Sequence, residues 1–254
     1  MKINVLGSGY MGKQICSLFV ILGHEVVIWQ NTTKNLDNSI NAEIIKLEKY
    51  FDLKSSGKYA IEQNISNLEE NITIETVKED LEIKKKLISK LKFKTNIFSN
   101  TSSLNLSLLG NNINGFHFMN PITLPLIELC IKGQYSENLL NQLLMSLKKI
   151  SYNIINVSDK SGFLVNRILF REISYFFYLY EVEKVDKKNL KSIYKLVNNN
   201  FDPIKIINMI GVDVSLKIME NLNMDNKDIY IPNTLKNAVK NGFLGYKNKK
   251  ILRI

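Results

Sequence analysis

The sequence contains two histidines, and we expect one of them to pair with an acidic residue. His24 lies in a Gly-His turn and is expected to be structural, whereas His117 ends the apolar segment Gly115-Phe116-His117-Phe118. Glu128 lies inside a second apolar segment, Leu126-Ile127-Glu128-Leu129, where an unpaired carboxylate would be costly to bury. A carboxylate beside an imidazole fixes its tautomer and raises its basicity. Such a pair can move a proton on or off an alcohol while hydride leaves the same carbon.

The first glycines have the spacing of a dinucleotide-binding turn. Gly7-Ser8-Gly9-Tyr10-Met11-Gly12 reads G-x-G-x-x-G, directly after an apolar run and before a helical pattern. Gly7 permits the tight turn, Gly9 lets the backbone approach a pyrophosphate, and Gly12 allows close packing of helix on strand. The exposed N–H groups of this turn, those of Tyr10 and Met11 included, would hold the phosphates with the help of the helix dipole.

The cofactor preference depends on the end of the next strand. Gln30 follows the apolar run Val26–Trp29, where an NAD-selective site normally has an acid for the ribose hydroxyls. Gln30 can hydrogen-bond a ribose, but it does not repel a 2′-phosphate as a carboxylate would. No arginine stands nearby, although Lys34 could meet such a phosphate. The sequence therefore favours NAD and leaves NADP open.

Alternating strands and helices are expected to position these residues, and the alternation stops after residue 157. The expected strands are Lys2–Leu6, Val26–Trp29, Ile72–Ile74, Asn96–Ser99, Ile113–Phe118, Leu126–Ile131 and Asn153–Val157. Beyond them the pattern is helical, over Phe163–Glu181, Lys187–Val197, Pro203–Asn221 and Thr234–Asn241. The sequence predicts an α/β fold with a Rossmann-type, doubly wound, mainly parallel sheet in residues 1–157. A smaller all-helical domain is expected in residues 158–254.

Composition excludes several classes of protein. The chain has 254 residues, of which 45% are hydrophobic and 23% charged, and no apolar run approaches the roughly 20 residues that span a bilayer. The N-terminus does not read as a signal peptide, and Cys16 and Cys130 are too few for a disulfide framework or a metal cluster. A cytoplasmic protein without a metal is expected. The net charge of +10 suits phosphate-rich cofactors or acidic carrier proteins, or is only a solvated surface, and no nucleic-acid-binding motif accompanies it.

Five short motifs, in order along the chain, resemble those of the short-chain L-3-hydroxyacyl-CoA dehydrogenases. The family's N-T-S-S-L, H-F-F-N-P, L-V-E-V, G-F-x-V-N-R and G-P-F…G-L-D segments are similar to residues 100–104, 116–121, 126–129, 161–167 and 201–213. The resemblance covers almost the whole chain. It implies a Rossmann domain followed by a helical domain, NAD as cofactor and a 3-hydroxyacyl thioester as substrate.

The resemblance also implies roles for individual residues. His117 would be the general base in oxidation and the acid in reduction, with Glu128 orienting it. Ser102 and Asn166 would bond the substrate oxygen and the nicotinamide end of the cofactor, Asn166 from the second domain. Further positions match the family's NAD contacts: Glu79, Lys84, Asn120 and Lys247. Members of the family typically form homodimers through the C-terminal domain.

Plainer interpretations exist for several of these residues. His117 alone fits a core histidine bonded to a backbone carbonyl. Ser102 could be a turn or helix-capping residue, and Asn166 could cap a helix. Glu79 and Lys84 could belong to a solvated helical face.

The chain also departs from the family pattern, and the departures keep other functions open. Gln30 replaces the acid, residues 31–71 are short where a helical arm usually touches CoA, and the basic tail lacks the family's T-G-x-G-F ending. The same chemistry on a carrier-protein-bound or free hydroxy acid is one alternative. A cofactor-binding homologue without turnover is another. The His117–Glu128 pair disfavours the β-hydroxyacid dehydrogenases, which rely on a lysine.

Overall fold

The computed structural model describes residues 1–33, 35–197, 201–225 and 227–253. Lys34, the possible partner of a 2′-phosphate, lies outside the described residues. Contacts divide the chain into two units, Met1–Asp159 and Lys160–Ile254. The units have separate apolar cores.

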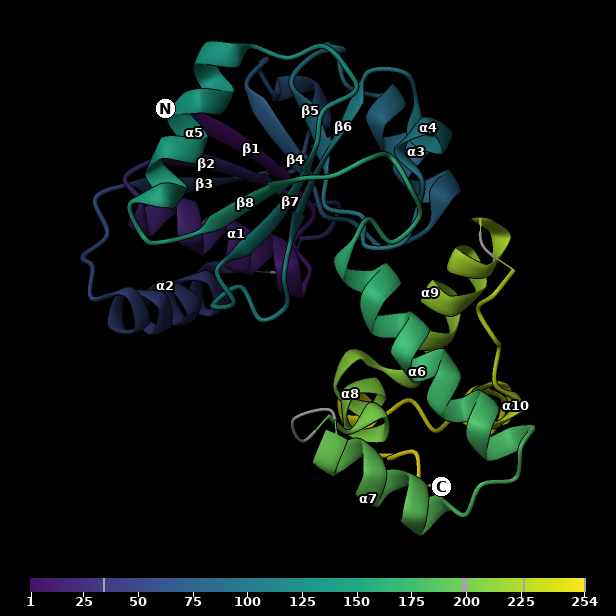
Figure 1. Ribbon diagram of the computed structural model, residues 1–254. Coiled ribbons are helices and arrows are strands. Elements are labelled where there is room, and N and C mark those ends of the chain that lie inside the picture. Colours follow the sequence, from purple (N-terminus) through teal and green to yellow (C-terminus); the bar gives the residue numbers. More distant parts are fainter. Residues whose placement is uncertain (34, 198–200, 226, 254) are drawn as a thin grey trace. The chain divides into compact units, whose positions relative to one another are not determined.

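In the described part of the N-terminal unit, eight strands form one sheet in the order β3-β2-β1-β4-β5-β6-β7-β8 (Figure 1). Their bounds are β1 Lys2–Leu6, β2 Glu25–Trp29, β3 Lys58–Glu62, β4 Ile72–Glu75, β5 Ile97–Ser99, β6 Ile113–Phe118, β7 Leu126–Cys130 and β8 Asn153–Asn156. Neighbours pair in parallel except β6 and β7, which are antiparallel. This mainly parallel sheet confirms the predicted fold class.

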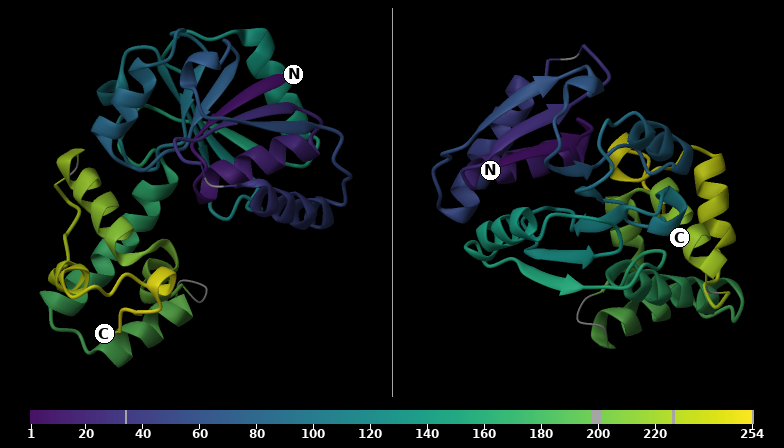
Figure 2. Two further views of the ribbon diagram at one scale, coloured as in Figure 1. Left: turned by 180° about the vertical axis from the view of Figure 1, so that it is seen from behind. Right: turned by 90° about the horizontal axis from the view of Figure 1, so that it is seen from above.

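Helices cover the sheet, and its central strands are buried on both faces. β1 and β4 are buried along almost their whole length, as expected for parallel strands between helical layers. The helices of this unit are α1 Tyr10–Ile21, α2 Asp37–Phe51, α3 Leu81–Ser89, α4 Leu106–Leu109 and α5 Glu137–Lys148. α1 packs beside α2, and α3 beside α4 (Figures 1 and 2).

Side-chain caps set where several of these helices begin. The Asp80 carboxylate accepts a hydrogen bond from the N–H of Ile83 at the start of α3, and Ser136 does the same at the start of α5. Such caps satisfy backbone donors that have no partner within the helix. The cap at Asp80 matters for the site, because α3 carries Lys84.

The C-terminal unit is helical, as the sequence predicts. Its helices are α6 Val165–Glu181, α7 Lys187–Val197, α8 Pro203–Ile210, α9 Val212–Asp225 and α10 Asn233–Lys240. α6 contributes Phe170, Ile173 and Phe177 to the core of this unit. No helix among the described residues is long and apolar enough to cross a membrane.

Two element predictions were wrong. Residues 58–62 form strand β3 within a region where no strand was predicted; as an edge strand it pairs only with β2 and is only partly buried. A single helix was expected over Pro203–Asn221, but the chain forms α8 and α9. Gly211 separates them with φ of +109°, a conformation outside the helical region that glycine adopts readily.

Candidate active site

His117 and Glu128 face each other across the antiparallel pair β6 and β7. Their Cα atoms are directly opposed in the register, and His117 Nδ1 lies 2.7 Å from Glu128 Oε2. Both side chains are buried, with 6% and 1% of each residue exposed. Directly opposed residues of an antiparallel pair project from the same face, so the pairing itself brings the two side chains together. A carboxylate acceptor makes Nδ1 the donor and leaves Nε2 as the nitrogen that exchanges a proton.

A second contact holds the end of β6 in place. The Asn100 side-chain oxygen, just after β5, accepts a hydrogen bond of 2.8 Å from the N–H of Phe118. The segment that begins the Asn-Thr-Ser-Ser-Leu motif is thereby tied to the residue after His117. The carboxyl ends of β5 and β6 lie at the edge where ligands bind in folds of this kind.

Glu79 organises the turn that contains Ser102. Its Oε1 accepts hydrogen bonds from the N–H groups of Ser102 and Ser103, both at 2.9 Å, and from the Thr101 hydroxyl at 2.6 Å. Burial opposes ionisation of Glu79, but the charge of Lys84 and these hydrogen bonds hold its pKa below the usual range. The carboxylate is therefore ionised at neutral pH, and it fixes the backbone on which Ser102 is carried.

Lys84 is buried between two carboxylates. Its Nζ lies 2.8 Å from both oxygens of Glu75 and 3.3 Å from Glu79 Oε2. Lys84 is 1% exposed and Glu75 is fully buried, which excludes a solvated helical face for this lysine. Glu75 also accepts a hydrogen bond from the hydroxyl of Ser99, on β5, at 2.6 Å. The network thus joins β4, β5, α3 and the turn of Ser102.

Glu75 was missed by the sequence analysis, although a signal for it was present. It ends the apolar strand Ile72-Thr73-Ile74-Glu75, just as Glu128 interrupts the apolar strand β7. The same rule, that a buried carboxylate needs a partner, would have indicated a nearby cation. Lys84, on the helix that follows β4, is that cation.

The glycine turn has the geometry that a dinucleotide needs. Gly7 adopts φ of +111°. A Cβ on Gly12 would lie 1.9 Å from the carbonyl oxygen of Gly7, whereas a Cβ on Gly9 would meet nothing within 4 Å. Gly12 therefore serves strand–helix packing, and Gly9 faces the open space in which a pyrophosphate could lie. Tyr10 and Met11 begin α1 beside it.

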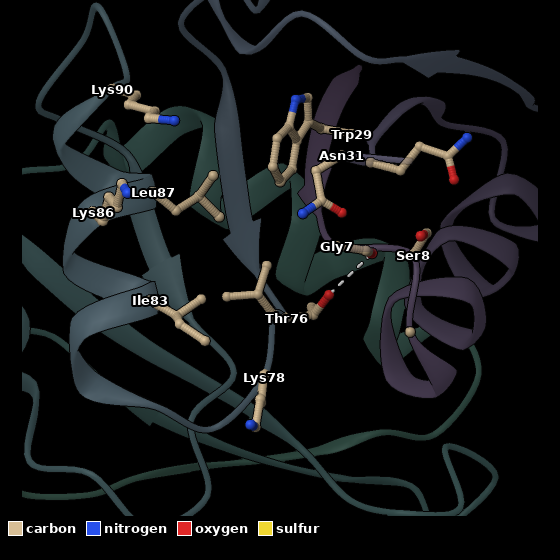
Figure 3. A pocket seen from close by; sticks show the side chains of 13 residues that line it. Gly7, Ser8, Trp29, Asn31, Thr76, Lys78, Ile83, Lys86, Leu87 and Lys90 are labelled. Carbon is tan, nitrogen blue, oxygen red and sulfur yellow. Dashed lines mark hydrogen bonds between the residues drawn. The ribbon is translucent and has the colours of Figure 1, made fainter. Parts of the chain in front are cut away.

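A pocket of about 540 Å³ extends from this turn toward the end of β2 (Figure 3). Gly7, Ser8 and Gly9 line one part of it, and Gln30 lies at the adenosine end expected for a Rossmann-type domain. Ile83 and Leu87 of α3 supply an apolar wall. These residues fit a dinucleotide.

The remaining predicted residues lie elsewhere. Asn120 follows β6 and is exposed, in the same unit as His117. Asn166 and Lys247 belong to the C-terminal unit. Asn166 is buried in the first turn of α6, but the N-cap position is Leu164, so Asn166 is not the capping residue. Lys247 forms an ion pair with Asp213, with Nζ 2.6 Å from Oδ2.

Comparison with protein families identifies the chain. Residues 2–160 match the NAD-binding domain of 3-hydroxyacyl-CoA dehydrogenase, and residues 162–252 match the C-terminal domain. The chain belongs to the 3-hydroxyacyl-CoA dehydrogenase family. NAD is accordingly the cofactor of this dehydrogenase.

Individual relatives agree with this assignment. The chain is 30% identical over 241 residues to a 3-hydroxybutyryl-CoA dehydrogenase of Clostridioides difficile, and the alignment covers 86% of each chain. Two crystal structures share the dehydrogenase fold. FadB2 of M. tuberculosis has a TM-score of 0.81 at 20% identity, covering 99% of this chain and 97% of that one. The (S)-3-hydroxybutyryl-CoA dehydrogenase of Ralstonia eutropha has a TM-score of 0.79 at 23% identity, covering 100% and 98%.

Among the described residues, no group of three or more His, Cys, Asp or Glu side chains could hold a metal ion. Cys16 and Cys130 are both buried and unpaired, and burial raises the pKa of the Cys16 thiol to about 12.

Proposed function

We propose that the protein interconverts 3-hydroxyacyl-CoA and 3-oxoacyl-CoA, with His117 as the acid–base group. The observation that carries the proposal is the buried contact of 2.7 Å between His117 and Glu128, at the carboxyl end of β6. Bound NAD supplies the hydride acceptor. The protein's own contribution is to hold the alcohol, remove its proton and stabilise the charge that results.

In the oxidative direction, His117 Nε2 takes the proton of the 3-hydroxyl group as the C–H hydride departs. The imidazolium that forms is stabilised by Glu128, whose carboxylate accepts the Nδ1–H hydrogen bond. In reduction the same proton returns to the 3-oxo oxygen as hydride arrives at carbon. Because Glu128 orients the ring in both directions, the pair serves a reversible reaction.

Ser102 and Asn166 are proposed to bond the substrate oxygen and the nicotinamide end of the cofactor. The support for Ser102 is the turn that Glu79 holds at the carboxyl end of β5. We propose that the main role of Glu79 and Lys84 is to hold this turn in place. Backbone N–H groups of residues 7–12 would hold the pyrophosphate and Gln30 the adenosine ribose, while Asn120 and Lys247 are proposed as further cofactor contacts.

The assay that tests this function is oxidation of NADH on addition of acetoacetyl-CoA. His117→Gln should lower kcat by about 10²–10⁴-fold, because a positioned acid–base group contributes about that factor. Glu128→Gln keeps the side-chain size and should also lower kcat, because the amide cannot stabilise the imidazolium. Both variants should still bind NADH, which fluorescence titration measures.

His24→Gln is the matched control, since it removes the other histidine. His24 lies in the turn between α1 and β2 with Nε2 2.9 Å from the Ser146 hydroxyl, so its replacement should leave kcat unchanged at pH 7.5. Turnover of His117→Gln within about tenfold of the unaltered protein would contradict the proposed role.

The thioester carrier is a separate question. Acetoacetyl groups on pantetheine and on an acyl-carrier protein, and free acetoacetate, should be compared with the CoA thioester. A preference for the carrier protein would replace CoA in the proposal. If none is reduced while NADH still binds, the protein is a homologue without turnover.

The homodimer is also a proposal. Its support is an exposed apolar face on α7, where Ile193, Leu196 and Val197 lie at helical spacing with 53%, 83% and 76% exposed. Sedimentation equilibrium checks it, and a monomer at micromolar concentration would contradict it. A reducing, cytoplasmic location is the setting that we propose for the two free thiols, and fractionation of the source cells tests it.

A further inference from the structure

The adenosine end of the cofactor pocket lacks the acid that normally excludes a 2′-phosphate. The chain leaves β2 through four neutral polar residues, Gln30-Asn31-Thr32-Thr33. Gln30 is 3% exposed, and its Oε1 accepts a hydrogen bond of 3.3 Å from the Thr32 hydroxyl. An amide and hydroxyl groups can donate hydrogen bonds to a phosphate, whereas a carboxylate would repel it.

Three lysines line the same pocket. Lys78, after β4, and Lys86 and Lys90, on the α3 side, belong to its lining together with Gln30 and Asn31. Figure 3 shows Lys86 and Lys90 on one side of the space and Trp29 and Asn31 on the other. There is no Asp or Glu among the described lining residues, so their formal charge is positive.

The nearest acid of the adjacent strand is directed into its own loop. Glu62, at the end of β3, accepts hydrogen bonds from the N–H groups of Gln63 and Asn64 through Oε1, at 2.8 and 2.7 Å. Its Oε2 accepts another from the Asn67 side chain at 3.1 Å. Glu62 therefore does not take the place of the missing acid in the pocket.

We propose that this pocket admits a ribose 2′-phosphate, so that the protein binds NADP(H) as well as NAD(H). A phosphate monoester carries about −1.5 to −2 charges at neutral pH, and the positive charges of the lysines that line the pocket attract it. The side-chain amides of Gln30 and Asn31, which line the pocket, supply the donors. The proposal rests on the proposed function for its hydride chemistry, but the binding it predicts requires no acyl substrate.

Nucleotide fragments test the pocket directly. Isothermal titration calorimetry of the full-length protein should compare adenosine 2′,5′-bisphosphate with 5′-AMP, which differ only in the 2′-phosphate. We expect the bisphosphate to bind at least as tightly as 5′-AMP at low salt. NADPH and NADH, compared by fluorescence titration, should show affinities within about tenfold of each other, equivalent to about 1.4 kcal/mol.

Substitutions test which residues control binding of the 2′-phosphate. Gln30→Glu should weaken the bisphosphate relative to 5′-AMP by about tenfold or more, because the new carboxylate repels the 2′-phosphate and can still accept hydrogen bonds from the ribose hydroxyls of 5′-AMP. Lys86→Gln combined with Lys90→Gln should weaken the bisphosphate and reduce the salt dependence of its binding. Lys85→Gln is the matched control, because Lys85 is exposed on the same helix and does not line the pocket.

Two results would overturn the proposal. One is bisphosphate binding about tenfold or more weaker than that of 5′-AMP in the unaltered protein. The other is an unchanged ratio of the two affinities in Gln30→Glu. If the bisphosphate binds as expected but no acyl thioester is reduced with either cofactor, the pocket inference stands and the proposed function fails.

Discussion

At the scale of single residues, the buried network around Lys84 shows how charge is accommodated inside this protein. Lys84 contacts both oxygens of Glu75 and one of Glu79, and neither Lys84 nor Glu75 reaches solvent. Two buried charges of opposite sign are tolerated as a pair, whereas one alone leaves an uncompensated charge. The free energy of unfolding should therefore fall more when one partner is replaced than when both are replaced.

Lys84→Met should lower the free energy of unfolding by about 3–5 kcal/mol, because it leaves Glu75 without its cation. Urea denaturation followed by circular dichroism measures the change. NADH affinity should fall as well, since Glu79 loses the charge that helps to hold the Ser102 turn. Lys84→Met combined with Glu75→Gln should recover part of the lost stability. A double variant no more stable than Lys84→Met would contradict a paired-charge role.

At the scale of elements, the segment formed by β1, the glycine turn and α1 has two separable roles. Gly12 is where α1 approaches the turn most closely, since its Cβ position lies 1.9 Å from the Gly7 carbonyl oxygen. Gly9 has φ of −67°, which any residue adopts, and open space where a Cβ would be. Gly12 is thus required by the fold, and we propose that Gly9 is required by the ligand.

Gly12→Ala and Gly9→Ala should therefore fail in different ways. Gly12→Ala should destabilise the protein by about 1–3 kcal/mol or more, because the backbone must move to admit the methyl group. Gly9→Ala should change stability by no more than about 0.5 kcal/mol, while NADH affinity falls by about tenfold or more as the methyl group displaces the pyrophosphate. Thermal denaturation and NADH titration measure the two effects. Full NADH affinity in Gly9→Ala would place the pyrophosphate elsewhere.

At the scale of the whole molecule, stability should depend on pH through a histidine outside the active site. His24 is buried between α1 and α5, with its ring edge against Phe19 and Nε2 bonded to Ser146. Burial, together with the positive charges of the N-terminus and Lys149, lowers the pKa of His24 to about 4. The unfolded chain therefore takes up this proton at a higher pH than the native protein does.

The stability contributed by neutral His24 is complete above about pH 6.5 and is lost as the pH falls toward 4, by at most about 1.4 kcal/mol per pH unit. Urea denaturation at several pH values, compared with His24→Gln, isolates this contribution. The difference between the two proteins should shrink from pH 7 to pH 4.5. Carboxylates with a lowered pKa, such as Glu79, change the stability at more acidic pH. They are present in both the unaltered protein and His24→Gln. A difference that does not vary with pH would exclude the histidine as its source.

Features that depend on local spacing and on the cost of burial could be predicted from the amino-acid sequence alone. The glycine turn was recognisable because its chemistry lies within six consecutive residues between a strand and a helix. Glu128 was recognisable because a carboxylate in an apolar strand requires a partner. The mainly parallel sheet and the helical part that follows it were predictable from the alternation of strands and helices and from the point where the strands stop.

Tertiary structure decided what depends on pairing between distant segments. The antiparallel register of β6 and β7 sets His117 opposite Glu128, and a slip of one residue would have placed them on opposite faces. Edge strand β3 lies in an otherwise polar region, and its pairing with β2 joins it to the sheet. The sequence left open whether Lys84 lies on a solvated helical face, and only the folded chain buries it against Glu75 of β4. Hydrogen-bond register and burial arise from the assembled chain, so no local pattern contains them.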